Sequence, residues 1–297
     1  MNGTAGIGME IFGVDFSGAE AAGRAIWVAA GRFEYDSLYI ESCRPGAELP
    51  GSGVGRAVCL AALARFIAQQ KNAAFGLDFP FSLAAPFIGG MRWEDYVRNF
   101  AMRYPTADAF RQACRGVAGG RELKRATDRV SRVPFAAYNL RLYRQTYYGI
   151  RDLLAPLVQE ESACILPMQA PIEGKPWLFE ICPASTLKAM RFYPSYKGRD
   201  PLLREARQRI LDELVARGAL MPLAAKLEER VLDDPGGDAL DSVIAAVATG
   251  QAAALSAESH RPSQLERVEG RVYFAATGTV KGAVQAGRDT GLPAGGP

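Results

Sequence analysis

The sequence reads GVDF at residues 13–16 and GLDF at residues 76–79, and each tetrapeptide lies at the end of a short apolar stretch. Nearly continuous apolar runs over residues 9–15 and 73–79 predict strands that are buried on both faces of a sheet. If these strands are parallel neighbours in register, Asp15 and Asp78 lie side by side, about 4.8 Å apart, at the carboxyl edge of the sheet. Open α/β sheets usually carry their functional sites at that edge.

The surrounding segments predict a mixed α/β sheet. Residues 25–30 and 35–43 have strand composition at hairpin spacing, and residues 54–69 have apolar residues at helical spacing. A strand after such a crossover helix is usually parallel to the earlier strands. Residues 176–181 predict another strand, and helices are expected over residues 201–217, 222–232 and 237–255. Residues 265–268 and 271–275 are expected to form a terminal hairpin.

Residues 81–175 differ in character, with Arg-rich and aromatic segments of helical period, notably 93–103 and 138–154. Residues 91–151 hold thirteen Lys and Arg against five Asp and Glu. We therefore expect one domain over residues 1–280 that includes a basic helical subdomain inserted at about 81–175. The Gly-rich residues 281–297 are expected to form a flexible tail.

The composition excludes several classes of site. His260 is the only histidine, which removes most Ser-His-Asp and Cys-His schemes and imidazole metal sites. The five cysteines are scattered without a CxxC pair, so neither a disulfide framework nor a thiolate zinc site is expected. No uninterrupted apolar run approaches about 18 residues, and the first eight residues do not have the pattern of a signal peptide. We therefore expect a cytoplasmic protein.

Three further acids accompany Asp15 and Asp78. Glu180 ends the last predicted core strand, and Asp238 and Asp241 share one face near the start of a helix. Two adjacent carboxylates either raise a pKa or bind a cation. Oxygen ligands suit Mg²⁺ or Mn²⁺, which can promote phosphodiester hydrolysis. Each acid alone also has an ordinary structural explanation, such as capping a turn, pairing with an arginine or lying at a helix N-terminus.

Four sequence blocks resemble domain-of-unknown-function family 429, whose members are predicted nucleases of the ribonuclease-H-like superfamily. The blocks are GVDFSGA (13–19), GLDFP (76–80), EICP (180–183) and GDALDS (237–242). The resemblance spans nearly the whole chain, and the last block is also similar to the end of Holliday-junction resolvases. Cys182 departs from the aromatic residue or histidine usual in the third block.

This resemblance implies a ribonuclease-H-like mixed sheet with flanking helices and a helical insertion. It also implies that the chain is a metal-dependent nuclease that hydrolyses DNA or RNA. The implied metal and catalytic site consists of Asp15, Asp78, Glu180, Asp238 and Asp241.

The basic segment predicts contact with nucleic-acid phosphates. Arg125 and Lys197 lie in short motifs that also resemble family 429, RATD (125–128) and YK (196–197), and they are the candidate substrate contacts. Arginines on helices are nevertheless often solvated, and the regular spacing of Trp93, Tyr96, Phe100 and Tyr104 is more typical of core residues.

Two other functions remain open. An actin-like phosphotransferase also has a first strand that ends in an acidic phosphate-binding turn, although DFSG at residues 15–18 fits that pattern only loosely. A non-catalytic ribonuclease-H-like domain could instead bind nucleic acid or another partner. Such a domain would bind nucleic acid with steep salt dependence and without cleavage.

Overall fold

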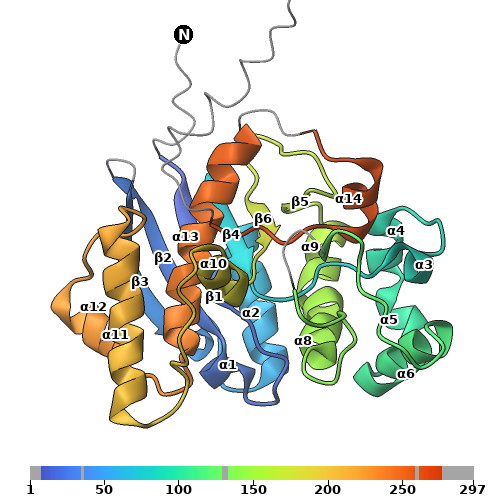
Figure 1. Ribbon diagram of the computed structural model, residues 1–297. Coiled ribbons are helices and arrows are strands. Elements are labelled where there is room, and N and C mark those ends of the chain that lie inside the picture. Colours follow the sequence, from blue (N-terminus) through green and yellow to red (C-terminus); the bar gives the residue numbers. More distant parts are fainter. Residues whose placement is uncertain (1–7, 35–36, 129–132, 258–260, 276–297) are drawn as a thin grey trace, which may run out of the picture.

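The computed structural model describes residues 8–34, 37–128, 133–257 and 261–275 (Figure 1). One mixed sheet contains six strands in the order β3-β2-β1-β4-β6-β5. The antiparallel half consists of β1 (Glu10–Asp15), β2 (Trp27–Glu34) and β3 (Ser37–Pro45). The parallel half continues from β1 through β4 (Ala73–Leu77), β6 (Trp177–Glu180) and β5 (Cys164–Leu166). The predicted α/β class with a mixed sheet is confirmed, whereas the expected tail at residues 281–297 lies outside the described residues.

The similar tetrapeptides GVDF (13–16) and GLDF (76–79) lie in register, as the sequence predicts. Gly13 pairs with Gly76, and Val14 pairs with Leu77, in the parallel ladder between β1 and β4. The backbone N–H of Asp78 donates a hydrogen bond to the carbonyl oxygen of Val14 at 3.1 Å. The two aspartates therefore occupy equivalent positions at the ends of neighbouring strands.

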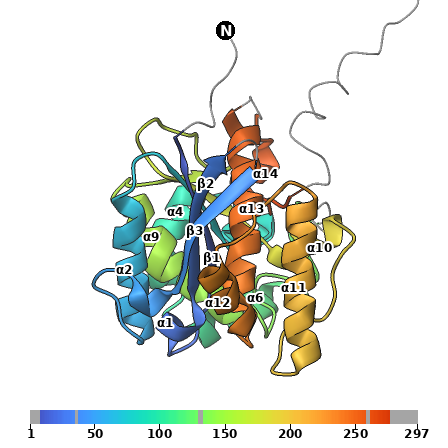
Figure 2. The ribbon, with the colours of Figure 1, turned by 90° about the vertical axis from the view of Figure 1, so that its left-hand side faces the viewer.

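Helices cover both faces of the sheet, which Figure 2 shows nearly edge-on between them. Because successive strand residues point to opposite faces, Phe12 and Val14 of β1 enter one core and Ile11 enters the other. The first core includes buried residues of α2 (Arg56–Ala68) and of the segment 81–175. The second includes α10 (Pro183–Ala189), α11 (Pro201–Ala216), α12 (Ala225–Asp233) and α13 (Asp238–Ala257). Asp15 follows Val14 and therefore faces α13.

α13 lies directly against the backbone of β1 and β4. A Cβ atom at Gly13 would overlap the carbonyl oxygen of Ser242 and the backbone nitrogen of Ala246, and one at Gly76 would overlap Oγ1 of Thr249. The glycines of GVDF and GLDF thus allow the close approach of this helix. Its segment Asp238–Ser256 is long and apolar enough to cross a membrane, with a mean hydropathy of 1.3, but is 78% buried within the protein.

Residues 81–175 contain helices and one strand, so the predicted insertion is not wholly helical. Its aromatic residues Trp93, Tyr96, Phe100 and Tyr104 are at most 5% exposed, and they share a core with α2. They are therefore core residues and not a stacking surface. The helices are α3 (Ala85–Ile88), α4 (Trp93–Arg98), α5 (Phe100–Arg103), α6 (Ala107–Val117), α8 (Tyr143–Tyr148) and α9 (Ala155–Gln159), with a π-helical segment, Gly149–Leu154, between the last two.

The predicted terminal hairpin is wrong, because residues 265–268 belong to a helix, α14 (Gln264–Glu269). The Ser263 hydroxyl accepts a hydrogen bond from the backbone N–H of Glu266, whose carboxylate accepts one from the backbone N–H of Ser263. This capping box favours a helix. Tyr273 instead forms an isolated bridge with Ile181, next to β6.

Candidate functional site

Four of the predicted acids lie together at the carboxyl edge of the parallel strands. Asp15 ends β1, Asp78 follows β4, and Asp238 and Asp241 lie in the first turn of α13. Burial raises the pKa of Asp15 well above its usual value, and the carboxylates of Asp241, Asp78 and Asp238 raise it further. Asp15 is 8% exposed and Asp241 is 3% exposed. We call these four residues the aspartate cluster.

Within the described residues, the carboxylates of Asp15 and Asp78 contact no cation directly, although the nearby Lys197 ammonium lowers the pKa of both. Among the described residues, neither carboxylate makes a hydrogen bond or an ion pair. Burial, followed by repulsion from Asp241, raises the pKa of the half-buried Asp78 to about 8. A carboxylate that is removed from water without a donor is destabilising unless it binds a proton or a cation. The pair therefore requires an additional positive charge to remain ionised.

Lys197 supplies one positive charge to the aspartate cluster. Its Nζ lies 2.6 Å from Oδ2 of Asp241 and 3.8 Å from Oδ1 of Asp238. Burial lowers the pKa of Lys197, but the nearby carboxylates of Asp241 and Asp15 raise it by more, so the ammonium remains charged. The side chain is 51% exposed. The structure thus places this predicted substrate contact against the acids, with access to solvent.

The backbone that carries Lys197 is held by a buried arginine that the sequence analysis missed. Nη1 of Arg207 donates hydrogen bonds to the carbonyl oxygens of Tyr196 at 2.6 Å and Gly198 at 3.2 Å. The Tyr196 hydroxyl donates to Oδ1 of Asp241 at 2.6 Å. Arg207 therefore fixes the residues on both sides of Lys197. An arginine within an amphipathic helix gives no sign of such backbone contacts in the sequence.

The donor atoms of the aspartate cluster suit a hard divalent cation. All four residues offer carboxylate oxygens, the ligands that Mg²⁺ and Mn²⁺ prefer. In the part of the chain that the structure describes, no three acidic, histidine or cysteine side chains are arranged to hold a metal ion. The single ammonium of Lys197 cannot neutralise all four acids when they are ionised. The chemistry of these side chains thus suits the metal, although in the described residues their oxygens do not converge on one shared position.

Glu180 does not join the aspartate cluster. It pairs in register with Leu77, one residue before Asp78, and therefore points to the opposite face of the sheet. Nη1 and Nη2 of Arg125 donate to its two carboxylate oxygens at 2.7 and 2.5 Å, and the backbone N–H of Phe81 donates at 3.0 Å. Burial raises the pKa of Glu180, and Arg125 opposes that shift. Its predicted role as a metal ligand is replaced by a structural ion pair.

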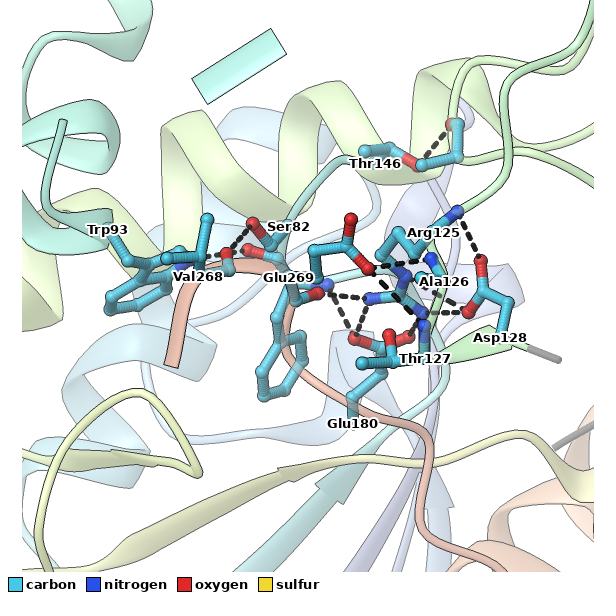
Figure 3. Close-up of polar contacts among 12 residues, drawn as sticks. Ser82, Trp93, Arg125, Ala126, Thr127, Asp128, Thr146, Glu180, Val268 and Glu269 are labelled. Atoms are coloured by element: carbon cyan, nitrogen blue, oxygen red, sulfur yellow. Dashed lines mark hydrogen bonds and ion pairs between the residues drawn. The ribbon is translucent and has the colours of Figure 1, made fainter. Parts of the chain in front are cut away.

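Arg125 is likewise a structural residue and not the predicted substrate contact. It is 3% exposed and also donates from Nε and Nη2 to Oδ1 of Asp128 at 3.0 and 2.7 Å (Figure 3). Its Nη1 reaches the carbonyl oxygen of Glu269 at 3.0 Å, and the Glu269 carboxylate accepts a hydrogen bond from the backbone N–H of Ala126 at 2.7 Å. This network joins residues 125–128, β6 and α14.

Gln145 connects the loops that follow β1 and β4, and the sequence analysis also missed it. Its Nε2 donates to the carbonyl oxygen of Phe16 at 2.5 Å and to that of Asp78 at 3.5 Å. A Cβ atom at Gly149 would overlap the Phe79 ring, so the helical segment that contains Gln145 packs closely on these loops. The insertion thus supports the backbone of both unpaired aspartates.

Part of the positive charge of the insertion is neutralised locally. Arg92 pairs with Asp95 at 2.9 Å, and Arg151 pairs with Asp152 at 2.6 Å. Arg129 and Arg132 lie outside the described residues. The excess of arginine in the sequence therefore overstates the charge available to a substrate.

No protein-family model, curated protein or solved structure matches this chain.

Proposed function

We propose that this protein is a ribonuclease-H-like, metal-dependent hydrolase of phosphodiester bonds in DNA or RNA. The proposal depends on one observation: Asp15 and Asp78 are neighbouring carboxylates without a partner, beside two further acids on α13. Such an arrangement is typical of a site that binds a cation. An antiparallel β1–β2–β3 half, with parallel strands on the other side of β1, is compatible with the proposed fold.

The residues of the aspartate cluster, Asp15, Asp78, Asp238 and Asp241, would hold the cation. A bound Mg²⁺ or Mn²⁺ would neutralise charge on the phosphate and make an attacking water more acidic. Because Lys197 contacts Asp241 in the structure, Asp241 would have to exchange the ammonium for the cation. The half-exposed lysine could then donate hydrogen bonds to a phosphate oxygen.

Metal binding can be tested without a substrate. Isothermal titration calorimetry with Mn²⁺ should give saturable binding, and Asp15→Asn should weaken it by about tenfold or more. Asp212→Asn is the matched control, because Asp212 is exposed on α11 and accepts a hydrogen bond only from Gln208 among the described residues. Absence of binding, or an equal loss in both variants, would remove the proposed metal site.

Catalysis requires a separate test. DNA and RNA substrates, including hairpins and branched junctions, should be cleaved in the presence of Mg²⁺ or Mn²⁺ by the wild-type protein but not by Asp15→Asn. No metal-dependent cleavage, or equal cleavage by that variant, would contradict the proposed nuclease function. Metal binding and nucleic-acid binding without cleavage would favour the non-catalytic alternative.

A further inference from the structure

Two arginines from different helices contact the loop that follows Asp15, residues 16–19, one through its side chain and the other through its backbone. Nη1 of Arg56, in α2, donates a hydrogen bond to the carbonyl oxygen of Gly18 at 3.0 Å. The backbone of Arg144, in α8, lies so close to Gly18 that a Cβ atom there would be 2.6 Å from the Arg144 carbonyl carbon and oxygen. No larger residue fits at Gly18 without a backbone shift. The loop thus fixes both helices beside the aspartate cluster.

Tyrosine side chains orient both guanidinium groups. Cζ of Arg56 lies 3.6 Å from the centre of the Tyr148 ring. Nε of Arg144 donates to the Tyr143 hydroxyl at 3.1 Å, and that hydroxyl donates to Oδ1 of Asp108 at 3.1 Å. Cation–π contacts and these hydrogen bonds restrict the arginines before any ligand binds, which lowers the entropy lost on binding.

Neither arginine has a carboxylate partner within the described parts of the chain. In this respect they differ from Arg92 and Arg151, each of which is paired with a nearby aspartate. Arg144 is exposed and Arg56 is half-buried. The Asp108 carboxylate attracts Arg144 only through the shared Tyr143 hydroxyl, without a direct ion pair. An oriented guanidinium that makes no direct ion pair can still bind a phosphate through two hydrogen bonds.

We propose that Arg56 and Arg144 bind backbone phosphates of a polynucleotide at the loop beside the aspartate cluster. This inference rests on the proposed function and names two residues that bind its polynucleotide substrate. The aspartate cluster repels a phosphate that is not accompanied by a cation, whereas the two arginines attract phosphates at the adjoining loop. A chain of phosphates matches this distribution of charge, and a mononucleotide would leave the arginines unused.

Binding is best measured in the Asp15→Asn background with EDTA, so that cleavage does not interfere. Fluorescence anisotropy with labelled single-stranded DNA, duplex DNA and RNA gives the affinity over a range of KCl concentrations. Replacing both Arg56 and Arg144 by glutamine should weaken binding about tenfold or more and reduce the salt slope by up to about two. Arg144→Gln alone changes an exposed residue and should produce about half of the slope change.

Arg103→Gln is the matched control, because Arg103 is also exposed and lies over tyrosine rings, in α5. No binding by the parent protein, or an equal loss in the control, would overturn the inference. Cleavage that is unaffected by both arginine substitutions would overturn it and leave the proposed function intact. Binding that depends on the arginines, without any metal-dependent cleavage, would support the inference and contradict the proposed function.

Discussion

Replacing Asp78 by asparagine should stabilise the metal-free protein at neutral and alkaline pH. Burial and the Asp241 carboxylate raise the pKa of Asp78 to about 8, from 3.8 in the unfolded reference. The folded state therefore binds the proton more tightly, and its stability falls as the pH rises from about 4 to about 8. At pH 7, the part of this shift that lies between pH 3.8 and pH 7 corresponds to about 4 kcal/mol. Because Asp78 is partly exposed, solvent screening should reduce the gain to about 1–3 kcal/mol.

Urea denaturation in EDTA between about pH 5 and pH 9 measures this effect through the unfolding free energy. The difference between Asp78→Asn and the wild type should be small at the acidic end and should grow toward pH 8. Asp212→Asn, at an exposed position, should follow the wild-type pH dependence. A wild-type pH dependence in Asp78→Asn, or a loss of stability at alkaline pH, would refute the repulsion inferred from the structure.

Three other substitutions separate structural residues from residues of the proposed metal site. Glu180→Gln weakens a buried ion pair and should lower the unfolding free energy measured in urea by about 1–3 kcal/mol. Calorimetry should show a nearly unchanged Mn²⁺ affinity. A loss of affinity equal to that of Asp15→Asn would contradict a structural role. Gly13→Ala should lower the unfolding free energy by about 1–3 kcal/mol because its Cβ atom overlaps α13. Gly116→Ala is the control, because a Cβ atom there meets no atom within 4 Å. Equal stability of the two variants would refute the close packing. Lys197→Met removes the ammonium from Asp241 and should tighten Mn²⁺ binding in calorimetry, so weaker binding would show that the lysine does not compete with the cation.

The sequence carried enough information to predict the core sheet and the pairing of its first two parallel strands. The repeated Gly-x-Asp pattern indicates their register because both glycines meet one helix and both acids end a strand. The spacing of Asp238 and Asp241 likewise indicates a shared helix face. These features depend on local periodicity, which is visible without knowledge of long-range contacts.

Glu180 shows where that reasoning fails. Its position at a strand end resembles that of Asp15, but a shift of one residue in register turns a side chain to the other face. Nothing in residues 176–181 specifies this register. The partners Gln145 and Arg207 also bind backbone atoms far away in the sequence, and no local pattern marks them.

The helix at the end of the described chain was predictable in principle. Ser263 and Glu266 have the spacing of a capping box, and that signal contradicts a strand at residues 265–268. The alternation of apolar residues over so few positions fits either element. A specific capping pattern therefore carried more information than the short hydrophobic pattern.

The contact between α13 and the two strand glycines also limits which acidic side chains fit at this edge. Because the helix touches the strand backbone at Gly13 and Gly76, little depth remains between the two elements. Aspartate, the shortest acidic side chain, can fill that depth from both sides. A glutamate in place of Asp15 or Asp241 would have one more methylene group. Its carboxylate would then extend further into the narrow space between α13 and the strand ends. Because Gly13 and Gly76 lack a Cβ atom, α13 lies close to the sheet, and this closeness determines which length of acidic side chain fits at the edge.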